Sequence, residues 1–284
     1  MGHHHGRHRA HGSRRAHCAS VRNNVIIVAL VSTKGGVGRT TLTANLAAAL
    51  SDQGRTVYAI EMDPQNSLQW HLGCAPGNVD GLARATIAGA AWRNATRTVG
   101  KVTLLPHGAL DEVDRLAFEQ ALYAQPDLLQ RHLLALAVPD DAVVLIDTAS
   151  GPSVYQRQAL GAADIALMVM LPDAASFAGM TTMTQQVQAY GRAGAKFFDT
   201  AVIVNQIDNA RQLAKDVVRV LPGALDDVPL GRIHRDESVA EALACQAFVA
   251  DYAPNAMATA DIALCAQALG ARIDAAQFAQ DAQA

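Results

Sequence analysis

The sequence predicts a three-layer αβα sandwich, an α/β fold in which helices cover both faces of a mostly parallel sheet. Four near-continuous apolar runs have the length of strands that are buried on both faces. They lie at residues 25–31, 142–146, 165–171 and 200–204. The first run is followed by a segment with helical spacing, 42–50, and then by another strand-like run, 56–62. This order favours parallel pairing, because the helix carries the chain back to the edge where the first strand began.

Between the second strand and the run at 142–146 the pattern is less regular. Residues 86–100 are small and polar and have no clear period. We expect a short strand at 101–105 and helices over 110–120 and 127–137, with a break at Pro126, which cannot continue a helix.

The last part of the chain alternates strands and helices again. A helix is expected to open after the strand at 165–171 and to run to about Tyr190. The other predicted elements are a helix over 211–221, a strand over 229–233 and closing helices over 238–244 and 256–269. We therefore assign residues 25–284 to one domain.

Residues 1–24 differ from the rest of the chain in composition. They hold five arginines, no acid and six of the ten histidines, and this composition predicts a disordered tail. Such a tail can bind metal or polyanions, although a tag remnant or an upstream start also explains it. The whole chain has a formal net charge of −3, so without those five positive charges residues 25–284 carry −8. An acidic folded body is a poor partner for nucleic acid or anionic lipid.

The remaining composition is that of a cytoplasmic protein. The four cysteines (Cys18, Cys74, Cys245 and Cys265) are scattered and have the spacing neither of a metal site nor of a disulfide framework. No apolar run approaches the roughly 18 residues of a membrane-spanning helix.

A glycine-rich loop joins the first strand to the first helix. It reads Lys34-Gly35-Gly36-Val37-Gly38-Arg39-Thr40-Thr41. Three glycines let the backbone turn tightly and point several N–H groups at one anion, and the helix N-terminus adds roughly half a positive charge. Thr40 provides a hydroxyl where such loops hold Mg²⁺, and Thr41 offers another donor to phosphate. The strand–loop–helix context predicts a phosphate-binding loop rather than a glycine turn without a ligand.

The loop departs from the pattern G-x-x-x-x-G-K-[ST] at two positions. Thr33 replaces the first glycine, and Arg39 replaces the lysine. Arg39 keeps a positive charge near the β and γ phosphates, but a planar guanidinium is not equivalent to a compact ammonium. We expect nucleotide binding to survive and hydrolysis to be slow, and whether hydrolysis occurs at all stays open.

The eight loop residues resemble the deviant Walker A motif of the ParA/MinD ATPases, which usually reads K-G-G-V-G-K-T-T. The resemblance covers about residues 25–270 and implies a P-loop NTPase of the SIMIBI, MinD-like type, with ATP and Mg²⁺ as cofactors. In that family the early lysine, here Lys34, reaches across a nucleotide-sandwich dimer to the partner's phosphates. The resemblance thus implies an ATP-dependent homodimer in which Lys34 takes part in catalysis.

Two aspartates close apolar strands. Asp63 follows the strand at 56–62, and Asp147 closes the run at 142–146. In a parallel sheet, a carboxylate at this end of a strand lies beside the ligand crevice, although an isolated Asp-Pro pair is more often a turn. The resemblance implies that Asp63 orients the attacking water and helps to organise Mg²⁺, and that Asp147 contacts Mg²⁺ as the Walker B residue. The family's first aspartate in D-x-D-P-Q is Glu61 here.

Two further segments extend the comparison with the family. After Asp147-Thr148, the family usually has two prolines in its γ-phosphate switch, whereas this chain has Ala149 and Ser150, so a less rigid switch is expected. The strand at 200–204 ends at Asn205. The resemblance implies that Asn205 recognises the adenine edge, for which an amide offers both a donor and an acceptor; a turn-forming asparagine is the alternative.

The sequence resembles one branch of the family in particular. Residues 63–73 follow the run D-P-Q-N-x-L-x-x-H-x-G of the BcsQ branch, and 80–85 and 151–155 match that branch as well. His71, which lies in the first run, is interpreted as structural or as a partner contact. The resemblance implies a role in the assembly or polar placement of a bacterial cellulose synthase complex. Its partners would be small accessory proteins of that complex, which would bring the protein to the cell pole or to the inner face of the inner membrane.

Two other members of the ParA/MinD family provide alternatives. Cell-division members end in a basic amphipathic membrane helix, but residues 273–281 carry two acids and no base, so no direct membrane anchor is expected. Partitioning members bind DNA, but residues 200–284 hold six basic residues against eleven acidic ones. A DNA- or plasmid-partitioning ATPase and a non-hydrolysing, nucleotide-locked scaffold stay open as alternatives.

Overall fold

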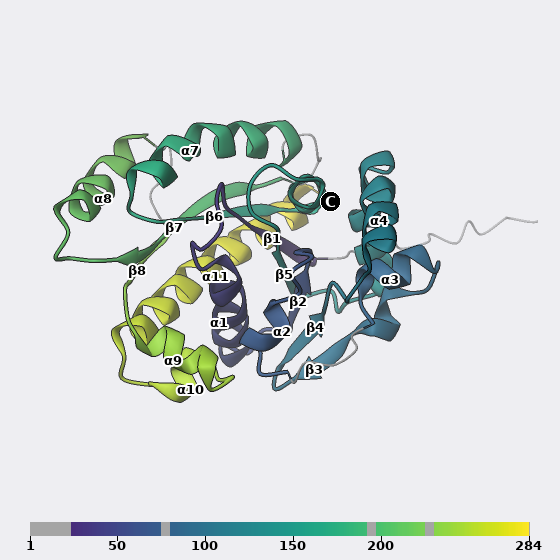
Figure 1. Ribbon diagram of the computed structural model, residues 1–284, viewed down its shortest axis with the longest axis horizontal. Coiled ribbons are helices and arrows are strands. Elements are labelled where there is room, and N and C mark those ends of the chain that lie inside the picture. Colours follow the sequence, from purple (N-terminus) through teal and green to yellow (C-terminus); the bar gives the residue numbers. More distant parts are fainter. Residues whose placement is uncertain (1–23, 75–79, 192–196, 225–229, 284) are drawn as a thin grey trace, which may run out of the picture.

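A twisted sheet runs through the middle of the molecule (Figure 1). The computed structural model describes residues 24–74, 80–191, 197–224 and 230–283. The strands within these ranges are β1 (Ile26–Val31), β2 (Val57–Glu61), β3 (Arg97–Val99), β4 (Val102–Leu105), β5 (Val143–Asp147), β6 (Ile165–Met170), β7 (Asp199–Ile207) and β8 (Gly231–His234). They form an eight-stranded sheet in the order β3-β4-β2-β5-β1-β6-β7-β8. Only the β3–β4 pair is antiparallel, which confirms the predicted mostly parallel sheet.

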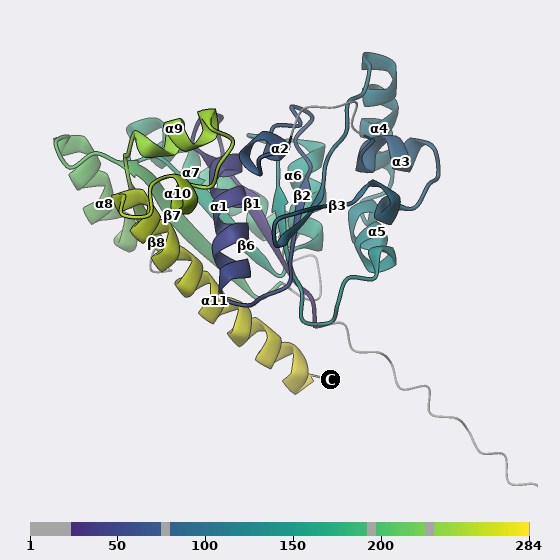
Figure 2. The same cartoon turned by 90° about the horizontal axis from the view of Figure 1, so that it is seen from below.

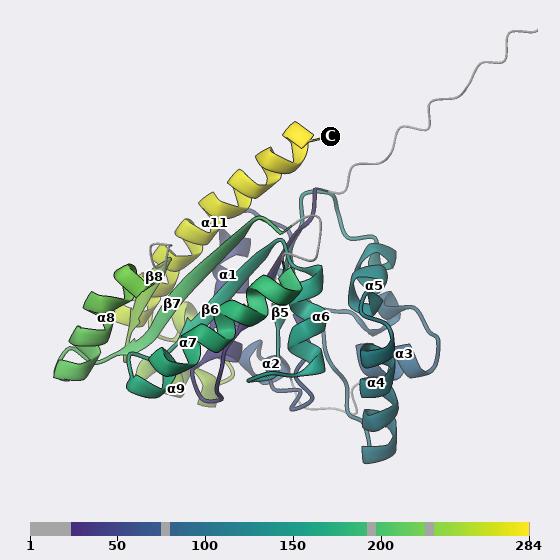
Figure 3. The same ribbon diagram turned by 90° about the horizontal axis from the view of Figure 1, so that it is seen from above.

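Helices lie on both faces of the sheet and complete the predicted three layers (Figures 2 and 3). One face carries α1 (Arg39–Asp52), α2 (Leu68–His71), α9 (Ser238–Ala244), α10 (Val249–Tyr252) and α11 (Met257–Gln283). The other carries α3 (Leu82–Ile87), the 3₁₀ helix η1 (Trp92–Ala95), α4 (Glu112–Ala124), α5 (Leu128–Leu136), α6 (Val154–Ala162), α7 (Ala174–Gln186), its π-helical continuation η2 (Val187–Gly191) and α8 (Gln212–Ala224).

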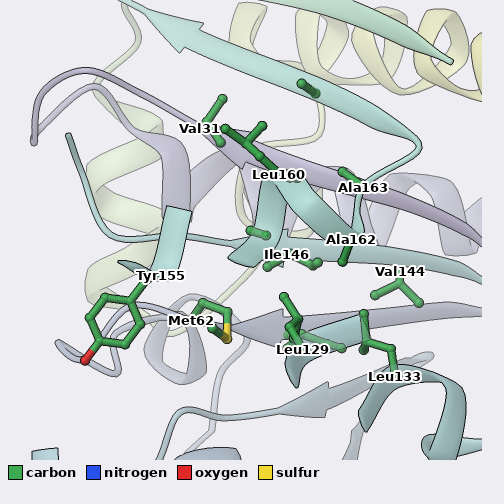
Figure 4. Packing of buried hydrophobic residues seen from close by; sticks show 14 of the residues in the cluster. Val31, Met62, Leu129, Leu133, Val144, Ile146, Tyr155, Leu160, Ala162 and Ala163 are labelled. Atoms are coloured by element: carbon green, nitrogen blue, oxygen red, sulfur yellow. The ribbon is translucent and has the colours of Figure 1, made fainter. Parts of the chain in front are cut away.

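Two apolar cores result, because successive side chains of a strand point to opposite faces of a sheet. In β1, Ile26, Val28 and Leu30 pack under α1 and α11, whereas Ala29 and Val31 pack under α5, α6 and α7. Figure 4 shows the second of these cores, where strand and helix side chains interdigitate. All five side chains are fully buried, so β1 is fixed from both faces.

The strand order places a crevice at the carboxyl end of β1. The strands β5 and β2 lie on one side of β1, and β6 and β7 lie on the other side. The direction in which strands are added to the sheet therefore changes at β1. Ligands of open α/β sheets bind at such a switch point, outside the carboxyl ends of the strands.

The structure also contains elements that the sequence pattern did not predict. The helix α6 was missed because its apolar period is interrupted by Gln156 and Gln158, which are buried polar residues. The helix α11 continues past the predicted end at 269 because Ile273 and Ala276 extend its buried face. Residues 1–23, the predicted tail, lie outside the described residues. No helix of the described ranges has both the length and the apolar character to cross a membrane.

Candidate functional site

The glycine-rich loop lies at the carboxyl end of β1, in the crevice that the strand order creates. The chain leaves β1 at Val31 and enters α1 at Arg39. Gly36 and Gly38 have φ angles of 74° and 85°, a region that L side chains rarely adopt. The predicted turn at these glycines is therefore present, and α1 begins directly behind it.

The residues predicted from separate strands meet at this edge. Asp147 ends β5 and pairs in register with Glu61 at the end of β2. Asp63 follows two residues after Glu61, and Asn205 reaches the loop from β7. Parallel neighbours bring their carboxyl ends together, which explains how these distant positions assemble.

Arg39 points into the protein, between the two aspartates. Its Nε donates to Asp147 Oδ1 at 3.1 Å, and its Nη2 donates to Asp63 Oδ2 at 3.2 Å. Its Nη1 donates to Ser32 Oγ at 2.6 Å. Arg39 is only 6% exposed, so these bonds form where water screens little. In this conformation the guanidinium lies on the two carboxylates that were predicted to serve magnesium and water.

Asp147 is fully buried at the centre of the site. Burial raises the pKa of Asp147, while the charge of Arg39 and a hydrogen bond from Thr40 act in the opposite direction. Thr43 Oγ1 also donates to Asp147 Oδ1, at 3.3 Å. Asp147 Oδ2 has no hydrogen-bond partner among the described residues. A buried, unpaired carboxylate oxygen beside a threonine hydroxyl is a set of hard donors that suits Mg²⁺.

Glu61 behaves differently from the two aspartates. Its Oε1 accepts a hydrogen bond from Leu68 N at 2.7 Å, but Oε2 is buried and has no partner in the described structure. Burial raises the pKa of Glu61 well above its ordinary value of 4.5, and the charges of Asp147 and Asp63 raise it further. The turn after β2 is thus held by a buried carboxyl group whose negative charge is disfavoured.

Lys34 forms an ion pair within its own chain. Its Nζ lies 2.7 Å from Asp173 Oδ2, and both side chains are about one third exposed. Asp173 also caps the N-terminus of α7 by accepting from Ser176 N at 2.7 Å. Although burial works to raise the pKa of Asp173, the hydrogen bonds from Lys34 and Ser176 outweigh it, so the pKa is lowered. Lys34 is thus held near the surface, at the mouth of the site.

The switch segment after β5 is tied to the end of β1. Thr148 Oγ1 donates to Leu30 O at 2.8 Å, and Gly151 N donates to Ser32 O at 2.9 Å. These two bonds hold the segment that contains Ala149 and Ser150 beside the loop.

A cavity of about 400 Å³ opens next to the loop. Its lining includes Gly38 and Thr41 from the loop, Asn205 from β7, and His234 and Asp236 from the segment after β8. Asn205 is 7% exposed, and its Nδ2 donates to Val37 O at 2.8 Å. This cavity is large enough for a nucleoside and is continuous with the glycine-rich loop.

Three residues of the site do not stand out in the sequence pattern. Ser32, Asp173 and Gln206 all contact the loop or its side chains. Asp173 had a signal, since it follows an apolar strand as Asp147 does, but its contact with Lys34 spans 139 residues of sequence. His71, by contrast, lies in α2, and burial lowers its pKa to about 4, which fits the structural interpretation.

Comparison with known proteins identifies related sequences over most of the chain. A sequence model of the family described as "Cellulose biosynthesis protein BcsQ" matches residues 25–269. The cellulose biosynthesis protein BcsQ of Salmonella typhimurium is 28% identical over 246 residues, which are 83% of this chain and 90% of that protein.

Solved structures share the fold. The septum site-determining protein MinD from Pyrococcus horikoshii, complexed with Mg-ADP, has a TM-score of 0.69 at 22% identity and covers 86% of this chain and 96% of its own. A complex of Cyanothece McdA with ATP has a TM-score of 0.74 at 18% identity and covers 87% and 97%. The predicted MinD-like P-loop fold is thereby confirmed.

Proposed function

Since the chain belongs to the family of the cellulose biosynthesis protein BcsQ, we propose that it is an ATP-binding protein that dimerises with ATP and supports bacterial cellulose biosynthesis. The main support for this proposal is that three features lie side by side at one edge of the sheet. The glycine-rich loop offers backbone N–H groups, Thr40 and Asp147 offer hard oxygen donors, and the adjacent cavity has room for a nucleoside.

Nucleotide binding requires Arg39 to change partners. In this structure its guanidinium pairs with both Asp63 and Asp147. We expect a triphosphate on residues 34–41 to attract the guanidinium more strongly than these two carboxylates do. When Arg39 turns to the β and γ phosphates, Asp147 and Thr40 become free to hold Mg²⁺, which supplies charge neutralisation at the phosphates. Asp63 becomes free to orient a water for attack on the γ-phosphate.

Dimerisation requires Lys34 to change partners as well. The ion pair with Asp173 is partly exposed and weak, on the order of 1 kcal/mol or less. Two phosphates of a partner protomer provide a larger negative charge, so Lys34 is expected to leave Asp173 and cross the dimer interface. The output of the cycle is the opening and closing of the dimer rather than a small-molecule product.

In the cell, we place this cycle beside the cellulose synthase complex. Small accessory proteins of that complex would recognise the ATP-bound dimer and bring it to the inner face of the inner membrane or to the cell pole. A strain that lacks the gene should lose cellulose output. Wild type should restore it, and Lys34→Ala should not. Full restoration by Lys34→Ala would contradict the role of the dimer.

In solution, the binding step has a direct test. Isothermal titration calorimetry with ATP and Mg²⁺ should show saturable binding by wild type. Thr40→Ala should weaken the magnesium-dependent part of that binding, while the exposed Thr181→Ala on α7 serves as the control. If wild type shows no measurable binding of ATP, the proposed function is wrong.

A nucleotide-locked scaffold is the second candidate, and the position of Arg39 favours it. The guanidinium of Arg39 binds both Asp63 and Asp147. It therefore competes for these carboxylates with the Mg²⁺ and the water that hydrolysis needs. Phosphate release by wild type and by Asp63→Ala distinguishes the two candidates. An ATPase loses its rate in the variant, whereas a scaffold shows the same background rate in both proteins.

DNA partitioning receives less support from the surface charges. Of the six basic residues counted between 200 and 284, four form ion pairs with acidic side chains. The pairs are Arg211–Asp208, Arg219–Asp216, Arg235–Glu237 and Arg272–Asp199. Paired arginines release fewer counterions from DNA, so binding to nucleic acid is not expected.

A further inference from the structure

Strand β7 contains one extra residue beside the glycine-rich loop. Val204 pairs with Arg232 and Ile207 pairs with His234, so three steps along β7 match two steps along β8. Gln206 takes up the extra length with a φ of 57°, in the left-handed region. A one-residue bulge of this kind re-aims the side chains around it.

The bulge changes which face each side chain reaches. Ile203 packs in the core under α1 and α11, and Val204 packs in the opposite core. Regular alternation would return Ile207 to the core of Ile203. Instead, Ile207 packs in the same core as Val204. One position has therefore been inserted, and both Asn205 and Gln206 are directed at the loop.

The two amides bind consecutive carbonyl groups of the loop. Asn205 Nδ2 donates to Val37 O at 2.8 Å, and Gln206 Nε2 donates to Gly36 O at 3.4 Å. The fit is close, because a Cβ atom on Gly38 would lie only 2.4 Å from Asn205 Nδ2. A side chain at this position would therefore meet both an unfavourable φ angle and the amide of Asn205, which would have to shift.

These two bonds also fix the donors on the other side of the loop. A trans peptide unit is planar, and its C=O and N–H groups point in opposite directions. Holding Gly36 O therefore orients Val37 N–H, and holding Val37 O orients Gly38 N–H, both away from β7. Donors that are fixed before the ligand arrives bind an anion without the cost of ordering the loop.

We propose that Asn205 and Gln206 are positioning residues, which hold the loop for a polyphosphate chain whichever base that chain carries. The proposal rests on the proposed function, since it concerns the same loop. It assigns to Asn205 a role different from recognition of the adenine edge, because one of the two N–H groups of its amide is already held by Val37 O.

Calorimetry with three ligands tests this role: ATP, GTP and inorganic tripolyphosphate, which has no base. We expect Asn205→Ala and Gln206→Met each to weaken all three ligands by a similar factor, about three- to tenfold. The ratio of ATP to GTP affinity should stay at the wild-type value. Gln212→Met is the control, because Gln212 is exposed and its amide bonds to Asp216 of the same helix.

Each outcome supports or overturns the role. The positioning role is wrong if a variant binds tripolyphosphate as tightly as wild type does. It is also wrong if a variant loses more affinity for ATP than for GTP. Melting of the ligand-free proteins checks the fold, and the exposed Gln206 gives a second variant if Asn205→Ala does not fold. If wild type binds no ATP, the proposed function fails and this role fails with it. If wild type binds ATP but the variants match it, only the positioning role is lost.

Discussion

At the scale of single residues, the buried charges of the site decide its behaviour. Arg39 balances the negative charges of Asp63 and Asp147, and burial beside them disfavours the ionised form of Glu61. Lysine at position 39 would offer one point charge in place of a fork with separate donors for both carboxylates. The arginine therefore stabilises the nucleotide-free form more than a lysine can.

Replacing Arg39 by lysine should separate stability from activity. We expect Arg39→Lys to lower the free energy of unfolding of the ligand-free protein by about 1–3 kcal/mol, because one of the two buried carboxylates loses its positively charged partner. Phosphate release in the presence of ATP and Mg²⁺ should rise, because Asp63 and Asp147 are less firmly occupied. Urea unfolding and a phosphate-release assay measure the two effects. An unchanged unfolding midpoint would contradict the compensating role of Arg39.

Glu61 should make stability depend on pH. Because burial raises its folded-state pKa above 4.5, the folded protein binds the proton more tightly than the unfolded chain does. The contribution of Glu61 is fully present below pH 4.5 and is lost as pH rises through the raised pKa. Glu61→Gln keeps the acceptor for Leu68 N and cannot ionise.

Urea unfolding between pH 5 and pH 8 checks this dependence. The stability of Glu61→Gln relative to wild type should increase as pH rises across that range. Glu112→Gln, on the exposed start of α4, is the control and should show little change with pH. A difference between Glu61→Gln and wild type that is constant with pH would show that Glu61 is ionised in the folded protein.

At the scale of elements, the loop and its neighbours were only partly predictable. The phosphate-binding loop could be recognised because glycines, an apolar strand and a helix follow one another in sequence. The bulge in β7 could not, because it is defined by the register with β8 and by contacts of Gln206 with Gly36, 170 residues away. Local sequence patterns predict helices and strands, whereas the direction in which a side chain points depends on the register with the neighbouring strand.

The glycines of the loop provide a matched pair of variants. Gly36 and Gly38 both have positive φ, but a Cβ at Gly36 meets no atom within 4 Å, whereas at Gly38 it meets Asn205. We expect Gly36→Ala to cost about 1 kcal/mol from backbone strain alone. Gly38→Ala should cost about 1–3 kcal/mol more from the clash. Equal unfolding free energies for the two variants would contradict the packing of Asn205 against the loop.

The start of α7 links the loop to dimer formation. Asp173 caps this helix and holds Lys34, and asparagine can keep the cap while losing the charge. Asp173→Asn should therefore form the ATP-dependent dimer at an ATP concentration about two- to fivefold lower, which corresponds to a partly exposed ion pair. Sedimentation velocity over an ATP titration measures the shift. A dimer that needs more ATP than wild type would argue against Lys34 being restrained by Asp173.

At the scale of the whole molecule, composition and apolar runs predicted the fold more completely than the site. The strands β1, β5, β6 and β7 were predicted because each contains a near-continuous apolar run. The helix α6 was not, because Gln156 and Gln158 interrupt its apolar face while their amides are buried. The site residues of β2 and β5 were predicted from their strand ends, but the pairing of Arg39 with both aspartates required the assembled sheet.

We propose that ATP closes two copies of this chain around the loop, with Lys34 crossing to the partner. Sedimentation or light scattering of the full chain, with ATP and Mg²⁺, tests it most directly. We expect the monomer mass to double with ATP, to stay unchanged with ADP, and to stay unchanged for Lys34→Ala with either nucleotide. A wild-type protein that binds ATP and stays at the monomer mass at every concentration would contradict the claim.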